Sequence, residues 1–171
     1  MAYFTAVIAR SGTSWKARDV EVDDVSSLEE LADALRSASQ DDQPVLAVIE
    51  HEDEWFALIR VDGDDEPRIF VSDLATTVQG HYAGLLASAA DVEVVDEVVD
   101  DDAGEDESGD DDEQEEPVVA AWAGDPEILD DLGVSARALR KLTEERGDDP
   151  GAVLAEIGET VGFSDLLDAL R

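Results

Sequence analysis

Two histidines supply the only imidazole groups in this chain, and one of them stands where imidazole chemistry is common. His51 lies within the acidic stretch Glu50–Glu54, and an imidazole beside carboxylates is a candidate metal ligand or general base. We predict neither role, because this stretch fits the exposed tip of a hairpin and adjacent strand residues point to opposite faces. His81 falls in a weak helical pattern and fits a surface or boundary position. The sequence therefore predicts no metal site.

Other chemistry-bearing patterns are missing from the sequence. It contains no G-x-S-x-G, no G-x-x-x-x-G-K-[ST] and no G-x-G-x-x-G, so serine hydrolases and nucleotide-binding enzymes have no local support. It also contains no cysteine, which excludes disulfides, thiolate metal sites and cysteine nucleophiles. Pairs of carboxylates carry little information in a chain with 46 acidic residues. We predict no catalytic residue, no cofactor and no enzymatic activity.

Acidic residues dominate the charge of the chain. Asp and Glu number 46 against 11 Lys and Arg, which gives a formal net charge of −35. A charge of this sign repels nucleic acid and anionic lipid, so we expect no direct nucleic-acid binding and no membrane contact. Two interpretations of the charge remain open. The acidic surface meets a basic partner, or it is a solvated surface that reflects the host's salt environment or codon bias.

Apolar runs indicate the elements that must position any functional side chain. The centre is two unbroken runs on either side of a charged turn, which favours a hairpin inside a sheet. The sequence predicts five strands, at Tyr3–Ala9, Trp15–Val22, Val45–Ile49, Trp55–Ile59 and Arg68–Val71. Lys16 and Arg18 share one face of the second strand. They fit solvated edge-strand charges, with a binding role as the alternative.

Helical spacing occurs twice in the first half of the chain. Ser26 and Glu29 fit a capping box that opens an amphipathic helix over about Ser27–Ala38. Asp73 fits the cap of a second helix, whose apolar stripe is Leu74, Val78, Tyr82, Leu85 and Ala89. Short connections between strands favour antiparallel pairing. We therefore predict an α+β domain with a mostly antiparallel five-stranded sheet, in the order ββαβββα, and two helices on one face.

The rest of the chain divides into an acidic segment and a helical end. Residues 91–117 hold many acids and few large apolar side chains, which is typical of a disordered linker. Beyond Pro117, caps and stops at Gly133, Gly147 and Gly162 predict four short helices. We predict an α+β domain over 1–90, an acidic disordered linker over 91–117 and a small helical subdomain over 118–171. So small a bundle is marginal alone, so we expect it to dock on the first domain or on another protein.

The start of the chain carries no pattern of a secretory signal. MAYFTAVIARSG lacks a basic n-region, and no apolar run approaches the roughly 20 residues of a membrane helix. We predict a cytoplasmic protein.

Several segments resemble a known family. MAYFTAVIAR, WKARDVEVDDVSSLEELADALR, QPVLAVIEHEDEWFALIRVDGDDEPRIFVSD, GDPEILDDLGVSARALRKL and VGFSDLLDAL are similar to the actinobacterial tRNA adenosine deaminase-associated proteins. The resemblance implies a genomic association with the tRNA-editing adenosine deaminase, and it brings no catalytic residues with it. The zinc deaminases themselves need an H-x-E and a P-C-x-x-C, and this sequence has neither.

The resemblance and the charge together favour a non-catalytic accessory protein that binds a basic partner, and the resemblance implies that the deaminase is this partner. We place the contact on two acidic turns and on the C-terminal helices. The residues of the turns are His51, Glu52, Asp53, Glu54, Asp62, Asp64, Asp65 and Glu66. A variant of this hypothesis is nucleic-acid mimicry, in which carboxylates occupy a phosphate-binding groove and compete with tRNA.

Two other functions stay open at this point. The first is a small enzyme or ligand-binding domain with a cleft between sheet and helices, lined by Trp15, Trp55, Tyr82 or Arg60. The second is a self-associating structural domain.

Overall fold

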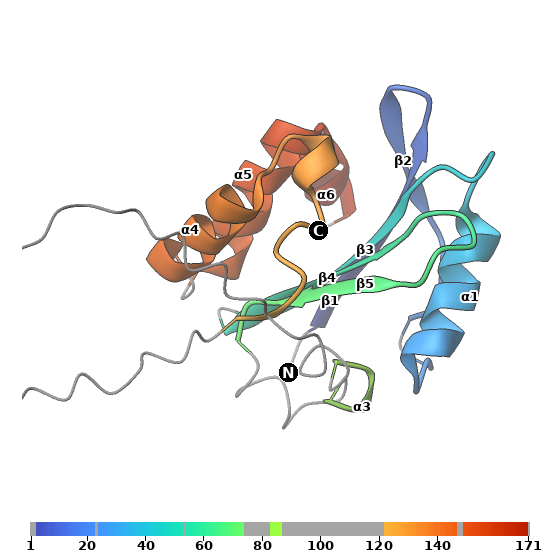
Figure 1. The fold of residues 1–171 in the computed structure, drawn as a ribbon, viewed down its shortest axis with the longest axis horizontal. Helices are drawn as coiled ribbons and strands as arrows, with labels where there is room; N and C mark the ends of the chain where they lie inside the picture. Colours follow the sequence, from blue (N-terminus) through green and yellow to red (C-terminus); the bar gives the residue numbers. More distant parts are fainter. Residues whose placement is uncertain are drawn as a thin grey trace, which may run out of the picture.

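An antiparallel sheet of six strands forms the centre of the computed structural model, which describes residues 3–22, 24–52, 54–73, 83–86, 122–146 and 149–170. The strand order is β2-β1-β3-β4-β5-β6. Figure 1 shows the sheet between α1 on one side and the C-terminal helices α4, α5 and α6 on the other. The strands are β1 Tyr3–Ser11, β2 Ser14–Arg18, β3 Val45–His51, β4 Trp55–Val61, β5 Arg68–Val71 and β6 Ala123–Gly124. The α+β class and the antiparallel pairing are as predicted.

The predicted count of five strands was wrong by one. All five predicted strands form, and the sixth, β6, pairs with β5 from the far side of the acidic segment. It was missed because it is only two residues long and contains no β-branched or aromatic side chain. The predicted second strand is also shorter than expected. It ends at Arg18, and Val22 packs into the core from outside the strand.

Helix α1, Leu28–Ala38, crosses over one face of the sheet to join β2 to β3. Both strands are antiparallel to β1, which lies between them, so they are parallel to each other. The helix begins one residue later than the predicted capping box. The Ser27 hydroxyl accepts from the Glu30 N–H at 3.2 Å, and the Glu30 carboxylate accepts from the N–H and hydroxyl of Ser26.

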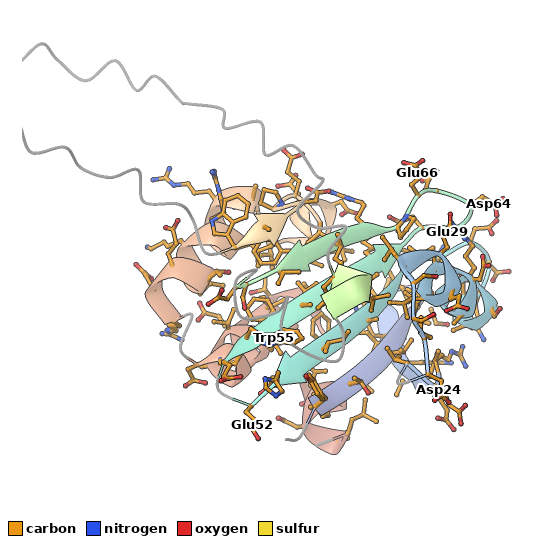
Figure 2. The ribbon with its side chains drawn as sticks, turned by 90° about the horizontal axis from the view of Figure 1, so that it is seen from below. Asp24, Glu29, Glu52, Trp55, Asp64 and Glu66 are labelled. Carbon is orange, nitrogen blue, oxygen red and sulfur yellow. The ribbon has the colours of Figure 1, made fainter. Side chains whose placement is uncertain are left out.

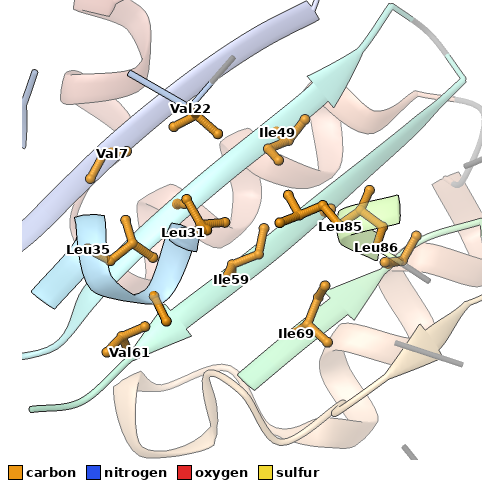
Figure 3. Packing of buried hydrophobic residues seen from close by; sticks show 14 of the residues in the cluster. Val7, Val22, Leu31, Leu35, Ile49, Ile59, Val61, Ile69, Leu85 and Leu86 are labelled. Atoms are coloured by element: carbon orange, nitrogen blue, oxygen red, sulfur yellow. The ribbon is translucent and has the colours of Figure 1, made fainter. Parts of the chain in front are cut away.

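One core lies between the sheet and α1 (Figure 3). Leu31 and Leu35 of α1 are fully buried against alternate residues of the strands, among them Val7, Ile49 and Ile59. The short helix α3, Ala83–Leu86, places Leu85 and Leu86 in the same core. Both helices therefore contribute to the core on this face, and the full extent of the predicted second helix stays a prediction. Most of the predicted second helix lies outside the described residues.

A second core fills the opposite face of the sheet. The other alternate strand residues point to it, including Leu46, Phe56 and Phe70, and they pack against the C-terminal elements. These elements are the 3-10 helix η2 Asp130–Leu132 and the helices α4 Ala136–Arg146, α5 Pro150–Val161 and α6 Ser164–Leu170. Both strands are buried along their whole length, and burial on both faces explains why the apolar runs Val45–Ile49 and Trp55–Ile59 are continuous rather than alternating.

Three of the four predicted C-terminal helices are present. The Asp149 carboxylate accepts from the Ala152 N–H at 3.0 Å with Pro150 in the first turn, and Gly162 ends the helix at φ +106°. The first predicted helix is instead a set of turns that ends in η2. The division into 1–90, 91–117 and 118–171 stays a prediction, because the acidic segment lies outside the described residues. The described C-terminal residues share a core with the sheet.

Candidate partner interface

The two acidic turns singled out in the sequence lie at opposite ends of β4. Residues 52–54 connect β3 to β4, and residues 62–67 connect β4 to β5. Seven strand residues, Trp55–Val61, separate them, which is about 20 Å at the rise of a strand. Figure 2 shows Glu52 far from Asp64 and Glu66. The predicted interface is therefore two separate surfaces.

The turn between β3 and β4 offers less acidic surface than predicted. His51 is not exposed: it ends β3, and only 6% of it is accessible. Its ring packs against Tyr3 at 4.4 Å between centroids, with the planes tilted by 30°, and lies 5.8 Å from Trp55. Its Nδ1 is 2.8 Å from the Glu54 Oε2, without hydrogen-bond alignment. Of this turn, exposed carboxylates are described at Glu52 and Glu54, and Asp53 lies outside the described residues.

The loop between β4 and β5 presents three exposed acids, Asp64, Asp65 and Glu66. Arg36 of α1 holds this loop in place by donating to the Gly63 carbonyl at 3.3 Å and to the Asp65 carbonyl at 3.1 Å. Because the backbone accepts these bonds, the carboxylates of the loop stay turned to solvent. Asp62, by contrast, turns inward to Arg60 and is the least exposed acid of the predicted set in this loop.

Two further acids stand beside this loop, and the sequence analysis did not identify them. Asp41 and Asp42, in the connection from α1 to β3, both have left-handed backbone conformations, with φ of 53° and 58°. A Cβ atom placed on Gly63 would lie 3.4 Å from the Asp42 Cβ, so the two connections are in contact. The antiparallel pairing of Val45 with Val61 brings them together.

We call this surface the acidic end of the sheet. Its exposed carboxylates come from α1 and from the two connections, and they are Asp33, Asp41, Asp42, Asp64, Asp65 and Glu66. Arg36 is the cation among them; it also pairs with Asp33 at 3.0 Å. Such a surface attracts cationic side chains over a distance set by salt. Within the described ranges, no three histidine or carboxylate side chains are grouped so as to hold a metal ion.

The residues proposed to line a cleft do not converge. Trp15 packs on the face covered by the C-terminal helices, whereas Trp55 packs on the α1 face. Arg60 is fully engaged in ion pairs, and Tyr82 lies outside the described residues. The geometry therefore does not support a ligand site built from this set.

Arg60 joins the sheet to the C-terminal segment. Its guanidinium is 4% exposed and donates to the Asp131 carboxylate through both terminal nitrogens, at 2.5 and 2.8 Å. It also donates to the Ile128 carbonyl at 2.8 Å, and its Nε lies 2.9 Å from the Asp62 Oδ2. Burial opposes the charged guanidinium, but the hydrogen bonds that it donates to Asp131 and the charges of Asp62 and Asp131 outweigh burial and raise the pKa of Arg60. The arginine is thus a structural anchor.

Asp131→Asn should lower the free energy of unfolding at pH 7 by about 1 kcal/mol. The variant leaves a buried guanidinium with one carboxylate fewer, but solvent around the 60% exposed Asp131 side chain screens the pair. Hydrogen bonding from Arg60 holds the pKa of Asp131 below its ordinary value of 3.8. The ionised carboxylate therefore stabilises the fold above that value, and this contribution is lost as pH falls through the folded pKa.

Urea unfolding of wild type and Asp131→Asn from pH 7 to pH 3 measures this effect. The difference between the two proteins should be constant above about pH 5 and shrink below about pH 4. Asp130→Asn is the matched control, since Asp130 is the neighbouring carboxylate and is exposed. A difference that stays constant to pH 3 contradicts the assignment.

None of the helices that the structure describes is long and apolar enough to cross a bilayer.

The family resemblance is confirmed by comparison with family models. The model described as Rv3753c-like tRNA adenosine deaminase-associated protein matches residues 3–164. This range includes β1 at one end and most of the C-terminal helices at the other. No curated protein and no solved structure matches the chain. The chain therefore belongs to the Rv3753c-like tRNA adenosine deaminase-associated protein family.

Proposed function

We propose that the protein is a non-catalytic accessory protein and that its acidic end binds a basic surface of the tRNA adenosine deaminase. The family name supports the identity of the partner. The observation that carries the place of contact is the gathering of six exposed carboxylates on α1 and on two connections. Arg36 fixes the β4–β5 loop to α1, and the other connection contacts this loop at Gly63. We expect this contact to form in the cytoplasm.

Charge supports the basic character of the partner surface. The chain carries a net charge of −35, and an enzyme that binds tRNA must present cations to phosphates. Complementary fields chiefly raise the association rate and select the partner, and their effect falls as salt rises. Co-purification of the two proteins at low and at moderate salt tests the proposal, and absence of a complex at low salt with both proteins folded contradicts it.

Charge-neutralising variants locate the contact. Asp64→Asn, Asp65→Asn and Glu66→Gln in one chain should weaken the complex about tenfold at low salt, at roughly 0.5 kcal/mol for each exposed ion pair. Two matched triples remove the same charge at the other predicted surfaces. One is Glu52→Gln, Asp53→Asn and Glu54→Gln, and the other is Glu159→Gln, Asp165→Asn and Asp168→Asn.

Titration calorimetry or surface plasmon resonance at several salt concentrations measures these variants. The two control triples should change the dissociation constant less than threefold. A larger effect from either control triple would show that the contact lies on the surface altered by that triple and not at the acidic end. Addition of tRNA distinguishes the mimicry hypothesis, because mimicry requires that tRNA displace the accessory protein. A ternary complex indicates a contact outside the tRNA-binding groove.

A further inference from the structure

A polar hollow of about 460 Å³ lies on the α1 face of the sheet, beside the edge strand β2. Arg18 and Asp19 line one side, and Ala34, Ser37, Ala38 and Gln40 line the other. Arg18 reaches this face because it pairs with Val7, whose side chain belongs to the α1 core. The hollow exists because α1 turns alanine and serine, rather than larger residues, toward β2. Its volume is within the range of ligand sites in proteins.

Arg18 is the residue of this hollow whose guanidinium has a nitrogen without a hydrogen-bond partner. Its Nε is inaccessible to solvent and has no hydrogen-bond partner in the part of the chain that the structure describes. Arg36, Arg60, Arg68 and Arg146 each have a carboxylate oxygen within 3.0 Å. Among the described residues, no such pair is found for Arg10, Arg18, Arg137 or Arg140, and of these four Arg18 alone has a solvent-inaccessible nitrogen without a partner. A buried donor without a partner is rare and indicates a missing acceptor.

The fork of a guanidinium suits a carboxylate, which accepts two parallel bonds. The opposite wall of the hollow carries negative charge and hydrogen-bond acceptors. It is the C-terminal end of α1, where backbone carbonyls carry partial negative charge, and Asp19 adds a carboxylate. The Ser37 and Ser39 hydroxyls already donate to the Asp33 and Gln43 carbonyls, so their oxygens remain as acceptors. This wall suits a ligand's N–H donor and disfavours a second negative charge.

We propose that the hollow is a binding site for a carboxylate with an N–H donor next to it, which is the chemistry of a polypeptide C-terminus or of a free amino acid. The carboxylate pairs with Arg18, and the N–H group faces the end of α1. The single guanidinium and the nearby Asp19 favour this ligand over a doubly charged phosphate. The site is separate from the acidic end and does not depend on the function proposed above.

Nuclear magnetic resonance titration of the full ¹⁵N-labelled chain tests this site. N-acetyl-L-alanine carries both groups, N-acetyl-L-alanine amide lacks the carboxylate, and L-alanine is the free amino acid. We expect N-acetyl-L-alanine to shift the Arg18 Nε–Hε signal and the amide signals of residues 37–40, with about millimolar affinity. The measurement is made at about 0.15 M NaCl, where the Debye length of about 8 Å screens the distant acids.

The amide probe should give no such shifts. Arg18→Gln should weaken binding of N-acetyl-L-alanine at least tenfold, whereas Arg137→Gln, an exposed arginine on α4, should leave it unchanged. Binding of L-alanine as tight as that of N-acetyl-L-alanine identifies a free amino acid as the source, and weaker binding identifies a polypeptide C-terminus. Equal shifts with the amide probe, or no response of the wild-type Arg18 signal to either carboxylate, overturn the proposal without reference to any variant.

Discussion

Replacing Phe163 by alanine should lower the free energy of unfolding by about 3–5 kcal/mol, the usual cost of removing a buried aromatic side chain. Phe163 is fully buried between α5 and α6, and its ring packs edge-on against Trp15 of β2 at 6.0 Å between centroids. The substitution leaves the backbone bonds to the Phe163 carbonyl intact and removes only the ring. The loss should therefore report the packing between the C-terminal helices and the sheet.

Urea unfolding followed by tryptophan fluorescence and by circular dichroism measures this loss. Leu170→Ala is the control, because Leu170 is 44% exposed and should change stability by less than about 0.5 kcal/mol. Both signals should report one transition, since the sheet and the C-terminal helices share a core. Two separate transitions would instead support the predicted helical subdomain as an independent unit.

Gly124→Ala should cost at least about 3 kcal/mol, through backbone strain together with overpacking. Gly124 has φ +101°, and a Cβ atom there would lie 2.2 Å from the Ile69 carbonyl oxygen. That carbonyl also accepts from the Asp125 N–H at 2.7 Å, so neither strand is free to move aside. The substitution should break the pairing of β6 with β5.

Gly12→Ala is the control that separates backbone strain from steric overlap of the added Cβ atom. Gly12 also has a positive φ, of 63°, but no atom lies within 4 Å of the position of a Cβ, so its loss should be only about 1–2 kcal/mol. Hydrogen exchange at Val71 and Asp125 should accelerate in Gly124→Ala and stay unchanged in Gly12→Ala. Equal loss of stability in the two variants would show that the close approach of β6 to β5 is unimportant.

The local parts of the fold were predictable from sequence, and the long-range parts were not. The unbroken apolar runs of β3 and β4 and the caps of α1 and α5 are encoded within a few residues, so their positions were predicted to within a residue or two. β6 depends on Ala123 and Gly124 meeting β5 across the acidic segment, and nothing in those two residues indicates a strand.

In the candidate site, too, the locally encoded features were predictable from sequence, and the features that depend on strand pairing were not. Exposure of Asp64, Asp65 and Glu66 follows from a polar connection between strands. His51 was misplaced because the sheet continues through it, and Tyr3, whose ring covers it, is a neighbour only through strand pairing. Arg60 was a usable signal, since a charge within a buried strand needs a partner, but the sequence does not identify Asp131.

The pairing of Val71 with Ala123 has a consequence for how this protein varies. The polypeptide leaves the sheet after Val71 and re-enters it at the paired residue Ala123, so the fold holds the two ends of the intervening stretch together as in a closed loop. Doubling the length of such a loop costs only about 0.6 kcal/mol in closure entropy. Insertions between α3 and β6 should therefore cost little folding free energy, whereas deletions that remove Leu85 or Leu86 should destabilise the core.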